Sequence, residues 1–168
     1  ARTTHPAFSN LFVSTEFDSQ AGVLLANRRT RSPLDQKRWI AAMAVTKESL
    51  IGDMEIETDR AQFIGRGRTV ANPEILEGEM PLSNTVGSVL DPIFSMRTRI
   101  RIEGGKTARI YFITATADSK ESALELIEKY NNGKACNEAF WLAMTRSQVE
   151  AKYLDIKTVY QITEEHRA

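Results

Sequence analysis

Cysteine, histidine and long apolar runs are scarce in this 168-residue chain. Cys136 is the only cysteine, so no disulfide can form within the chain, and a free thiol suits a reducing compartment. His5 and His166 stand near opposite ends, and no cluster of His, Cys, Asp and Glu has metal-ligand spacing. No apolar run approaches the roughly 20 residues that span a bilayer. We therefore expect no metal, no cofactor and no membrane-spanning helix in this chain.

Net charge is also absent. Lys and Arg together number 22, as do Asp and Glu, so the formal charge is zero. This balance argues against broad attraction to nucleic acid or an anionic membrane, and we expect no nucleic-acid partner. A row of arginines could still form a basic stripe for phosphate or an acidic partner, although the neutral total favours an ordinary exposed sheet face. The row comprises Arg97, Arg99, Arg101 and Arg109.

Strand-like patterns fill the first two thirds of the chain. Residues 8–17 and 23–26 predict a hairpin around turn-forming residues 18–22. Residues 38–46 are apolar at both odd and even positions, which fits a strand covered on both faces or a short buried helix. Residues 94–116 predict the clearest hairpin, with its turn at 103–106. The long loop at 70–90 should be functional or held by a neighbour.

The period changes to that of a helix near Asp118. Asp118 and Glu121 resemble a capping box, and residues 131–133 should end this helix. Further helices are expected at 134–153 and 157–167. Strands followed by helices predict a mainly β protein, an antiparallel β-sandwich over 1–117 with a helical appendage over 118–168. The apolar stripe of the first helix comprises Ala123, Leu126, Ile127 and Tyr130.

A glycine-rich stretch at 57–73 carries the most suggestive polar residues. Glycine allows close backbone approach or positive φ, and arginine offers a planar fork of donors to hydroxyl or anionic oxygens. The alternative is a solvated basic turn, since loops collect glycine and charge. The candidates for ligand binding are Asp59, Arg60, Arg66 and Arg68, around Gly65 and Gly67.

Other side chains have weaker claims to chemistry. Glu55, Glu57 and Asp59 share one strand face, and two carboxyl groups about 5 to 9.5 Å apart can break glycosidic bonds. Strand neighbours would lie on the same side of the sugar, however, so a solvated strand face is the favoured interpretation. We expect Trp39 and Trp141 in the core and Cys136 as a buried thiol.

Several irregular motifs in order resemble a known family. They lie at 57–73, 81–87 and 90–94, with shorter matches at 5–13 and 31–33. Together they resemble the β-sandwich region of family 94 glycoside phosphorylases, in the version that occurs inside cyclic β-1,2-glucan synthases. The resemblance runs from about His5 to about Tyr153. It implies a galactose-mutarotase-like supersandwich that packs on an (α/α)₆ barrel, and that barrel carries the catalytic acid and the phosphate site.

The resemblance implies a supporting role. The chain contains no barrel sequence, so we expect no catalytic residue in it and a domain fragment that shapes the glucan cleft of a glycosyltransferase and glycoside phosphorylase. The fragment should be soluble, within a parent on the cytoplasmic side of the bacterial inner membrane. The expected partners are β-1,2-glucan, the barrel and, through exposed sheet edges, a second copy. The alternatives are an autonomous carbohydrate-binding module and a complete small enzyme using Glu55, Glu57 and Asp59.

Overall fold

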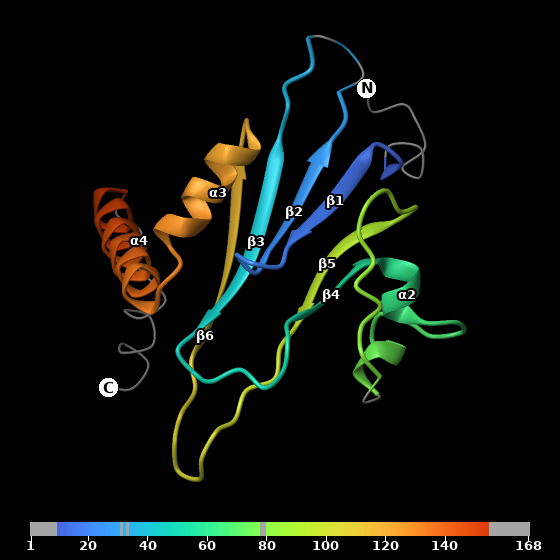
Figure 1. The fold of residues 1–168 in the computed structure, drawn as a ribbon. Helices are drawn as coiled ribbons and strands as arrows, with labels where there is room; N and C mark the ends of the chain where they lie inside the picture. The colour runs from blue at the N-terminus through green and yellow to red at the C-terminus, as the bar shows by residue number, and fades with distance from the viewer. Residues whose placement is uncertain (1–9, 31, 33, 78–79, 155–168) are drawn as a thin grey trace.

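A computed structural model describes residues 10–30, 32, 34–77 and 80–154 (Figure 1). The strands are β1 (Val13–Asp18), β2 (Val23–Arg28), β3 (Trp39–Thr46), β4 (Glu55–Asp59), β5 (Pro92–Arg97) and β6 (Ile110–Ala117). The helices are α2 (Arg60–Ile64), the 3-10 helix η1 (Glu74–Leu76), α3 (Lys120–Lys129) and α4 (Gly133–Tyr153). One antiparallel sheet has the order β1-β2-β3-β6, and β4 pairs with β5 in a second. The expected antiparallel β architecture with C-terminal helices is confirmed.

The first hairpin forms where its sequence predicted it. Asp18 pairs with Val23, and its Oδ1 accepts hydrogen bonds from the N–H groups of Gln20 and Ala21, each at 3.0 Å. This side chain therefore closes the turn that joins β1 to β2. A buried hydrogen bond of 2.9 Å between the hydroxyls of Thr15 and Thr58 then links the larger sheet to β4.

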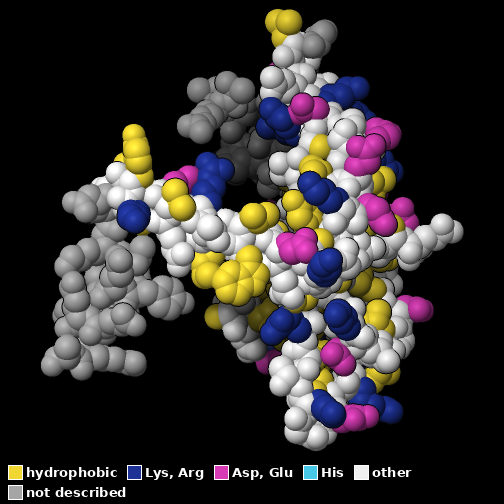
Figure 2. All heavy atoms as spheres, turned by 90° about the vertical axis from the view of Figure 1, so that its left-hand side faces the viewer, with side chains coloured by type: hydrophobic (Ala, Val, Ile, Leu, Met, Phe, Trp, Pro, Cys, Tyr) yellow, Lys and Arg dark blue, Asp and Glu magenta, His cyan; other side chains and the backbone are white. Residues whose placement is uncertain are grey.

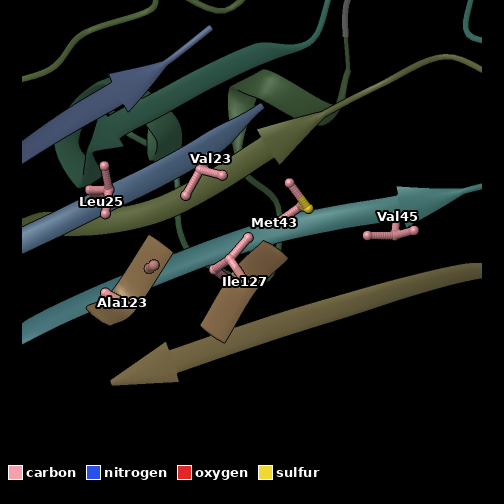
Figure 3. Close-up of a cluster of buried hydrophobic side chains, with 7 residues drawn as sticks. Val23, Leu25, Met43, Val45, Ala123 and Ile127 are labelled. Carbon is pink, nitrogen blue, oxygen red and sulfur yellow. The ribbon is translucent and has the colours of Figure 1, made fainter. Parts of the chain in front are cut away.

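The apolar segment at 38–46 forms the strand β3, so the alternative of a short buried helix is wrong. Ala41, Met43 and Val45 belong to a buried cluster with α3, whereas Ala42 is buried opposite Leu24 on the other face. Both faces are covered in the middle of β3, although Ile40 is 41% exposed, and this double covering explains why the sequence does not alternate. Figure 3 shows side chains of β2, β3 and α3 pointing toward one another in this cluster.

Helix α3 covers the sheet with a stripe slightly different from the predicted one. Ala123 and Ile127 are buried as expected, but Leu126 is 38% exposed. Ser119 is the N-cap and accepts a hydrogen bond of 3.0 Å from the Ser122 N–H, so the capping box at Asp118 is wrong by one residue. Asp118 instead forms an ion pair with Arg38.

The clearest hairpin of the sequence does not form as a strand pair. Residues 103–106 do turn, since the Lys106 N–H donates to the Glu103 carbonyl at 3.0 Å. However, β5 pairs with β4 and β6 pairs with β3, in different sheets. Alternation identifies a strand without naming its partner, and here each strand finds a better one. β6 lays Tyr111 and Ile113 against the cluster under α3, whereas β5 brings a cation to an acid on β4.

The long loop at 70–90 is held by its neighbours. Asn84, at a φ of 56°, donates its N–H to the Ile56 carbonyl at 3.0 Å and accepts from the Ile56 N–H at 2.8 Å through Oδ1. Leu82 is buried, and Gly87 exchanges two backbone hydrogen bonds of 2.9 Å with Thr15. The loop is therefore fastened to β4 and β1. This confirms the expectation that a neighbour holds it.

Helix α4 packs on the rest of the chain mainly at its first turns. Asn132 caps it by accepting from the Ala135 N–H at 2.8 Å, and Cys136 is buried, as expected for an inert thiol. Trp141 is 66% exposed, so its assignment to the core is wrong, whereas Trp39 does pack against the core. Figure 2 views the molecule from the side of α4 and shows hydrophobic side chains at the surface. Other exposed apolar residues of α4 are Phe140, Leu142, Met144, Val149 and Tyr153.

Three further expectations are not tested by the described residues. The helix expected at 157–167 and the two histidines fall outside the described residues, and the division at 117 and 118 stays a prediction. Within the described residues, no helix combines the length and apolarity needed to cross a membrane.

Candidate functional site

The glycine-rich stretch begins with a short helix that the sequence analysis missed. Asp59 is the N-cap of α2, and its Oδ1 accepts the Ala61 N–H at 2.9 Å. An aspartate immediately before a run without glycine or proline is the signal that could have revealed this turn of helix. Asp59 therefore has a structural task, which is to satisfy a free N–H at the start of α2.

Gly65 ends α2 and brings the following loop onto η1. Its φ of 82° and ψ of 162° lie in a region that is essentially restricted to glycine. A Cβ atom at this position would overlap the Glu74 side chain, approaching its Cβ to 2.5 Å. The sequence correctly singled out Gly65, and both of the expected reasons, positive φ and close approach, apply.

The three candidate arginines project from this region but have different partners. Arg60 pairs with Asp91 at 3.1 Å, and its backbone N–H donates to the Asp91 carbonyl at 3.1 Å. Arg68 pairs with Glu77, and this guanidinium holds the pKa of the Glu77 carboxyl below its ordinary value. Arg66 is exposed and has no recorded ion pair or hydrogen bond among the described residues. The structure thus anchors the loop on either side of Arg66 and leaves its donors available.

The two glutamates of β4 do not form a solvated strand face, contrary to expectation. Glu57 is 1% exposed and accepts the Asp59 N–H at 2.9 Å and the Ser83 hydroxyl. Glu55 accepts the Leu82 N–H at 2.9 Å and the Arg97 Nε–H at 3.1 Å. Both acids fasten the 70–90 loop to the sheets. The facing of Glu55 and Arg97 in the β4–β5 register is visible only once strand pairing is known.

The expected row of arginines is likewise not a continuous free stripe, and only Arg97 lies on β5. The Arg97 side chain is 22% exposed and also donates to the Ile75 carbonyl at 3.2 Å and to the Met80 carbonyl. Arg99 lies 3.9 Å from the other carboxylate oxygen of Glu55. Within this row, the side chains of Arg101 and Arg109 are exposed and form no ion pair among the described residues. Arg97 therefore connects β4 to η1 and to the 70–90 loop.

The contacts of Glu55 with the Leu82 N–H and Arg97 make the free energy of unfolding depend on pH in the acidic range. The Leu82 N–H and then Arg97 hold the pKa of Glu55 below its ordinary value of 4.5. A lowered folded-state pKa stabilises the protein above the unfolded-state pKa, and that contribution is lost as the pH falls below 4.5. We expect the unfolding free energy of the wild type to exceed that of Glu55→Gln by a constant amount near neutral pH. Denaturant titrations should find this difference shrinking below pH 4.5. A difference independent of pH would contradict this role for the Glu55 charge.

The chemistry available here is recognition by cations on a fixed loop. Glu55 and Glu57 are engaged with internal donors and share one face of β4, so they are not acids placed on opposite sides of a ligand. Nor does any group of His, Cys, Asp and Glu within the described ranges have the arrangement of a metal site. An exposed guanidinium beside a rigid turn suits hydroxyl or anionic oxygens.

Comparison with known proteins agrees with the motifs and the fold. The family described as glycosyl hydrolase 94, supersandwich domain, matches residues 1–133. The chain is 33% identical over 156 residues to a protein named cyclic beta-(1,2)-glucan synthase NdvB from Rhizobium meliloti (strain 1021). The match covers 93% of this chain but about 6% of the length of that relative. The chain therefore belongs to the glycosyl hydrolase 94 supersandwich domain family.

Proposed function

We propose that this chain is a non-catalytic wall of the glucan cleft in a cyclic β-1,2-glucan synthase, on the cytoplasmic side of a bacterial inner membrane. The likeness to a relative of that name supports the substrate class. The observation that carries the proposal is the exposed Arg66, held between a glycine in contact with η1 and an anchored Arg68. In this proposal Arg66 faces the glucan, while Asp59, Arg60 and Arg68 hold the loop that presents it.

A rigid wall can aid a reaction without performing it. Loops that are already ordered lose less conformational entropy when a ligand binds. The fastening of the 70–90 loop by Glu55 and Glu57 supplies that order next to Arg66. Because both acids are engaged in this way, the catalytic acid is assigned to the adjoining (α/α)₆ barrel. The alternative of a complete small enzyme relies on Glu55, Glu57 and Asp59, and each of these described acids is engaged with internal donors rather than placed across a sugar from another.

The exposed apolar residues of α4 support the barrel as a neighbour. Phe140, Trp141 and Leu142 are each at least 66% exposed, an unusual concentration for a helix facing only water. Helices pack through apolar side chains that interdigitate, and the barrel offers helices. We assign this surface of α4 to the barrel, because the helix leaves its own sheet after its first turns.

The direct test substitutes Arg66 in the synthase proposed to contain this domain. Arg66→Ala should raise the KM for β-1,2-glucan in phosphorolysis about tenfold or more, because a charged hydrogen bond is lost, with kcat retained. Arg101→Ala is the matched control, since it removes another exposed arginine from a different loop. An unchanged KM for Arg66→Ala would remove Arg66 from the cleft.

Calorimetry separates this role from that of an autonomous carbohydrate-binding module. Titration of this chain alone with β-1,2-glucan should give no measurable heat if the barrel supplies most of the cleft. Clear heat that Arg66→Ala abolishes and Arg101→Ala preserves would favour the module. Release of glucose 1-phosphate from glucan and phosphate by the chain alone would refute the non-catalytic assignment altogether.

A further inference from the structure

A basic hollow lies at one end of the larger sheet, where β2 ends and β3 begins (Figure 1). Asn27 and Trp39 are partners in the β2–β3 register, and both side chains line this hollow of about 250 Å³. None of the described residues that line it is acidic. Its other walls include four cationic side chains, Arg28, Arg29, Lys37 and Arg38.

The charges of these four side chains are only partly balanced. Arg38 forms an ion pair with Asp118, so its charge is already compensated. Arg28, Arg29 and Lys37 are exposed and form no ion pair among the residues that the structure describes. Positive charge therefore concentrates in this basic hollow, although the chain as a whole is neutral.

A hollow lined by cations is suited to a small, highly charged anion. A cleft lined by one sign of charge focuses the electric field and raises the local concentration of the opposite ion. Guanidinium groups bind phosphate oxygens through two parallel N–H bonds, and lysine adds a point charge. A phosphate monoester carries a charge of about −1.5 to −2 at pH 7. That charge suits the unbalanced cations of the basic hollow.

We propose that the basic hollow binds a small phosphorylated sugar, with its phosphate group on Arg28, Arg29 and Lys37. The phosphate part follows from these cations. The sugar part rests on the proposed function, because phosphorolysis of glucan releases a sugar phosphate. Asn27 offers an amide to the sugar hydroxyls, and Trp39 supplies an apolar wall.

The size and shape of the basic hollow favour such a ligand over a membrane surface. Its volume of about 250 Å³ lies just below the roughly 300–1,000 Å³ of pockets for drug-sized ligands, which suits a smaller molecule. An anionic membrane would instead be attracted by a broad basic face, and the zero net charge of the chain gives it no general attraction of that kind.

Tryptophan fluorescence tests the site at its own position. The chain contains two tryptophans, and of these only Trp39 lines the basic hollow, so Trp141→Phe makes the signal specific. Titration of this variant with glucose 1-phosphate should give a saturable change. Adding Arg29→Ala or Lys37→Ala should each raise the Kd about tenfold or more, because a hydrogen bond to a charged group is lost.

Three controls accompany the titration. Arg101→Ala removes an exposed arginine from the loop between β5 and β6 and should leave the Kd unchanged. Glucose should give no change, because it lacks the phosphate. Inorganic phosphate should bind more weakly, because it lacks the sugar. Arg29 and Lys37 form no ion pair among the described residues, so their variants should retain the circular dichroism of the parent.

Other outcomes would overturn the proposal. Absence of a saturable response to glucose 1-phosphate would refute the site, as would an equal loss of affinity in Arg101→Ala. Inorganic phosphate that binds as tightly as glucose 1-phosphate would refute the sugar part. Binding to phosphatidylglycerol vesicles without a response to glucose 1-phosphate would assign the basic hollow to a membrane instead. The titration uses neither glucan nor turnover, so its failure is distinguishable from failure of the proposed role of Arg66.

Discussion

Ile127→Ala is expected to lower the unfolding free energy by about 2–5 kcal/mol, the usual range for truncating a large aliphatic core residue. Ile127 is 2% exposed and inserts from α3 among the side chains of β2 and β3 (Figure 3). An alanine there removes apolar contact on the α3 side and leaves a space that the strands cannot close. Chemical denaturation followed by circular dichroism measures the change.

The neighbouring Leu126 provides the control for this prediction. Leu126→Ala removes a similar aliphatic group from the same helix, and alanine is at least as good a helix former. Because Leu126 is 38% exposed, we expect a loss below about 1 kcal/mol. Equal losses for the two variants would mean that α3 presents the stripe predicted from the sequence rather than the observed one.

Local features were the predictable part of this fold. The hairpin between β1 and β2 and the start of α4 each depend on residues close in sequence, such as Asp18 and Asn132. The double-sided burial of β3 was also readable from its composition. In contrast, the partners of β5 and β6 depend on contacts between distant segments. Residues 94–116 have the alternation and the turn of a hairpin, yet β3 and β4 compete successfully for both strands.

The same limit applied to the candidate site. The sequence identified Gly65 and its flanking arginines, but it could not separate anchoring arginines from the exposed one. Glu57 looked solvated because its neighbours alternate, whereas Ser83, 26 residues further along, closes over it. Trp141 looked like core because large aromatics usually are, but α4 extends beyond the sheet that would bury it. Each error concerns which distant segment covers a residue. A pattern of neighbouring residues in the sequence cannot predict that contact.

Gly65→Ala is expected to cost about 2–6 kcal/mol, since two separate effects act at this position. An L-residue in this backbone conformation, which is essentially restricted to glycine, costs roughly 1–3 kcal/mol, and overpacking adds about 1–3 kcal/mol. The overlap involves Cβ of Glu74, which cannot rotate away, so η1 itself must move. We expect the loop at 66–72 to lose protection from amide hydrogen exchange while the cluster under α3 keeps its own, because the two regions share no buried contact.

Gly67 isolates one effect from the other. It has a φ of 74°, close to the 82° of Gly65, but a Cβ atom there would meet nothing within 4 Å. Gly67→Ala should therefore show only the backbone cost of roughly 1–2 kcal/mol. Denaturant unfolding of both variants gives the difference directly. If Gly67→Ala were as destabilising as Gly65→Ala, contact with η1 would have no part in holding this turn, and the rigidity assigned to Arg66 would lose its physical basis.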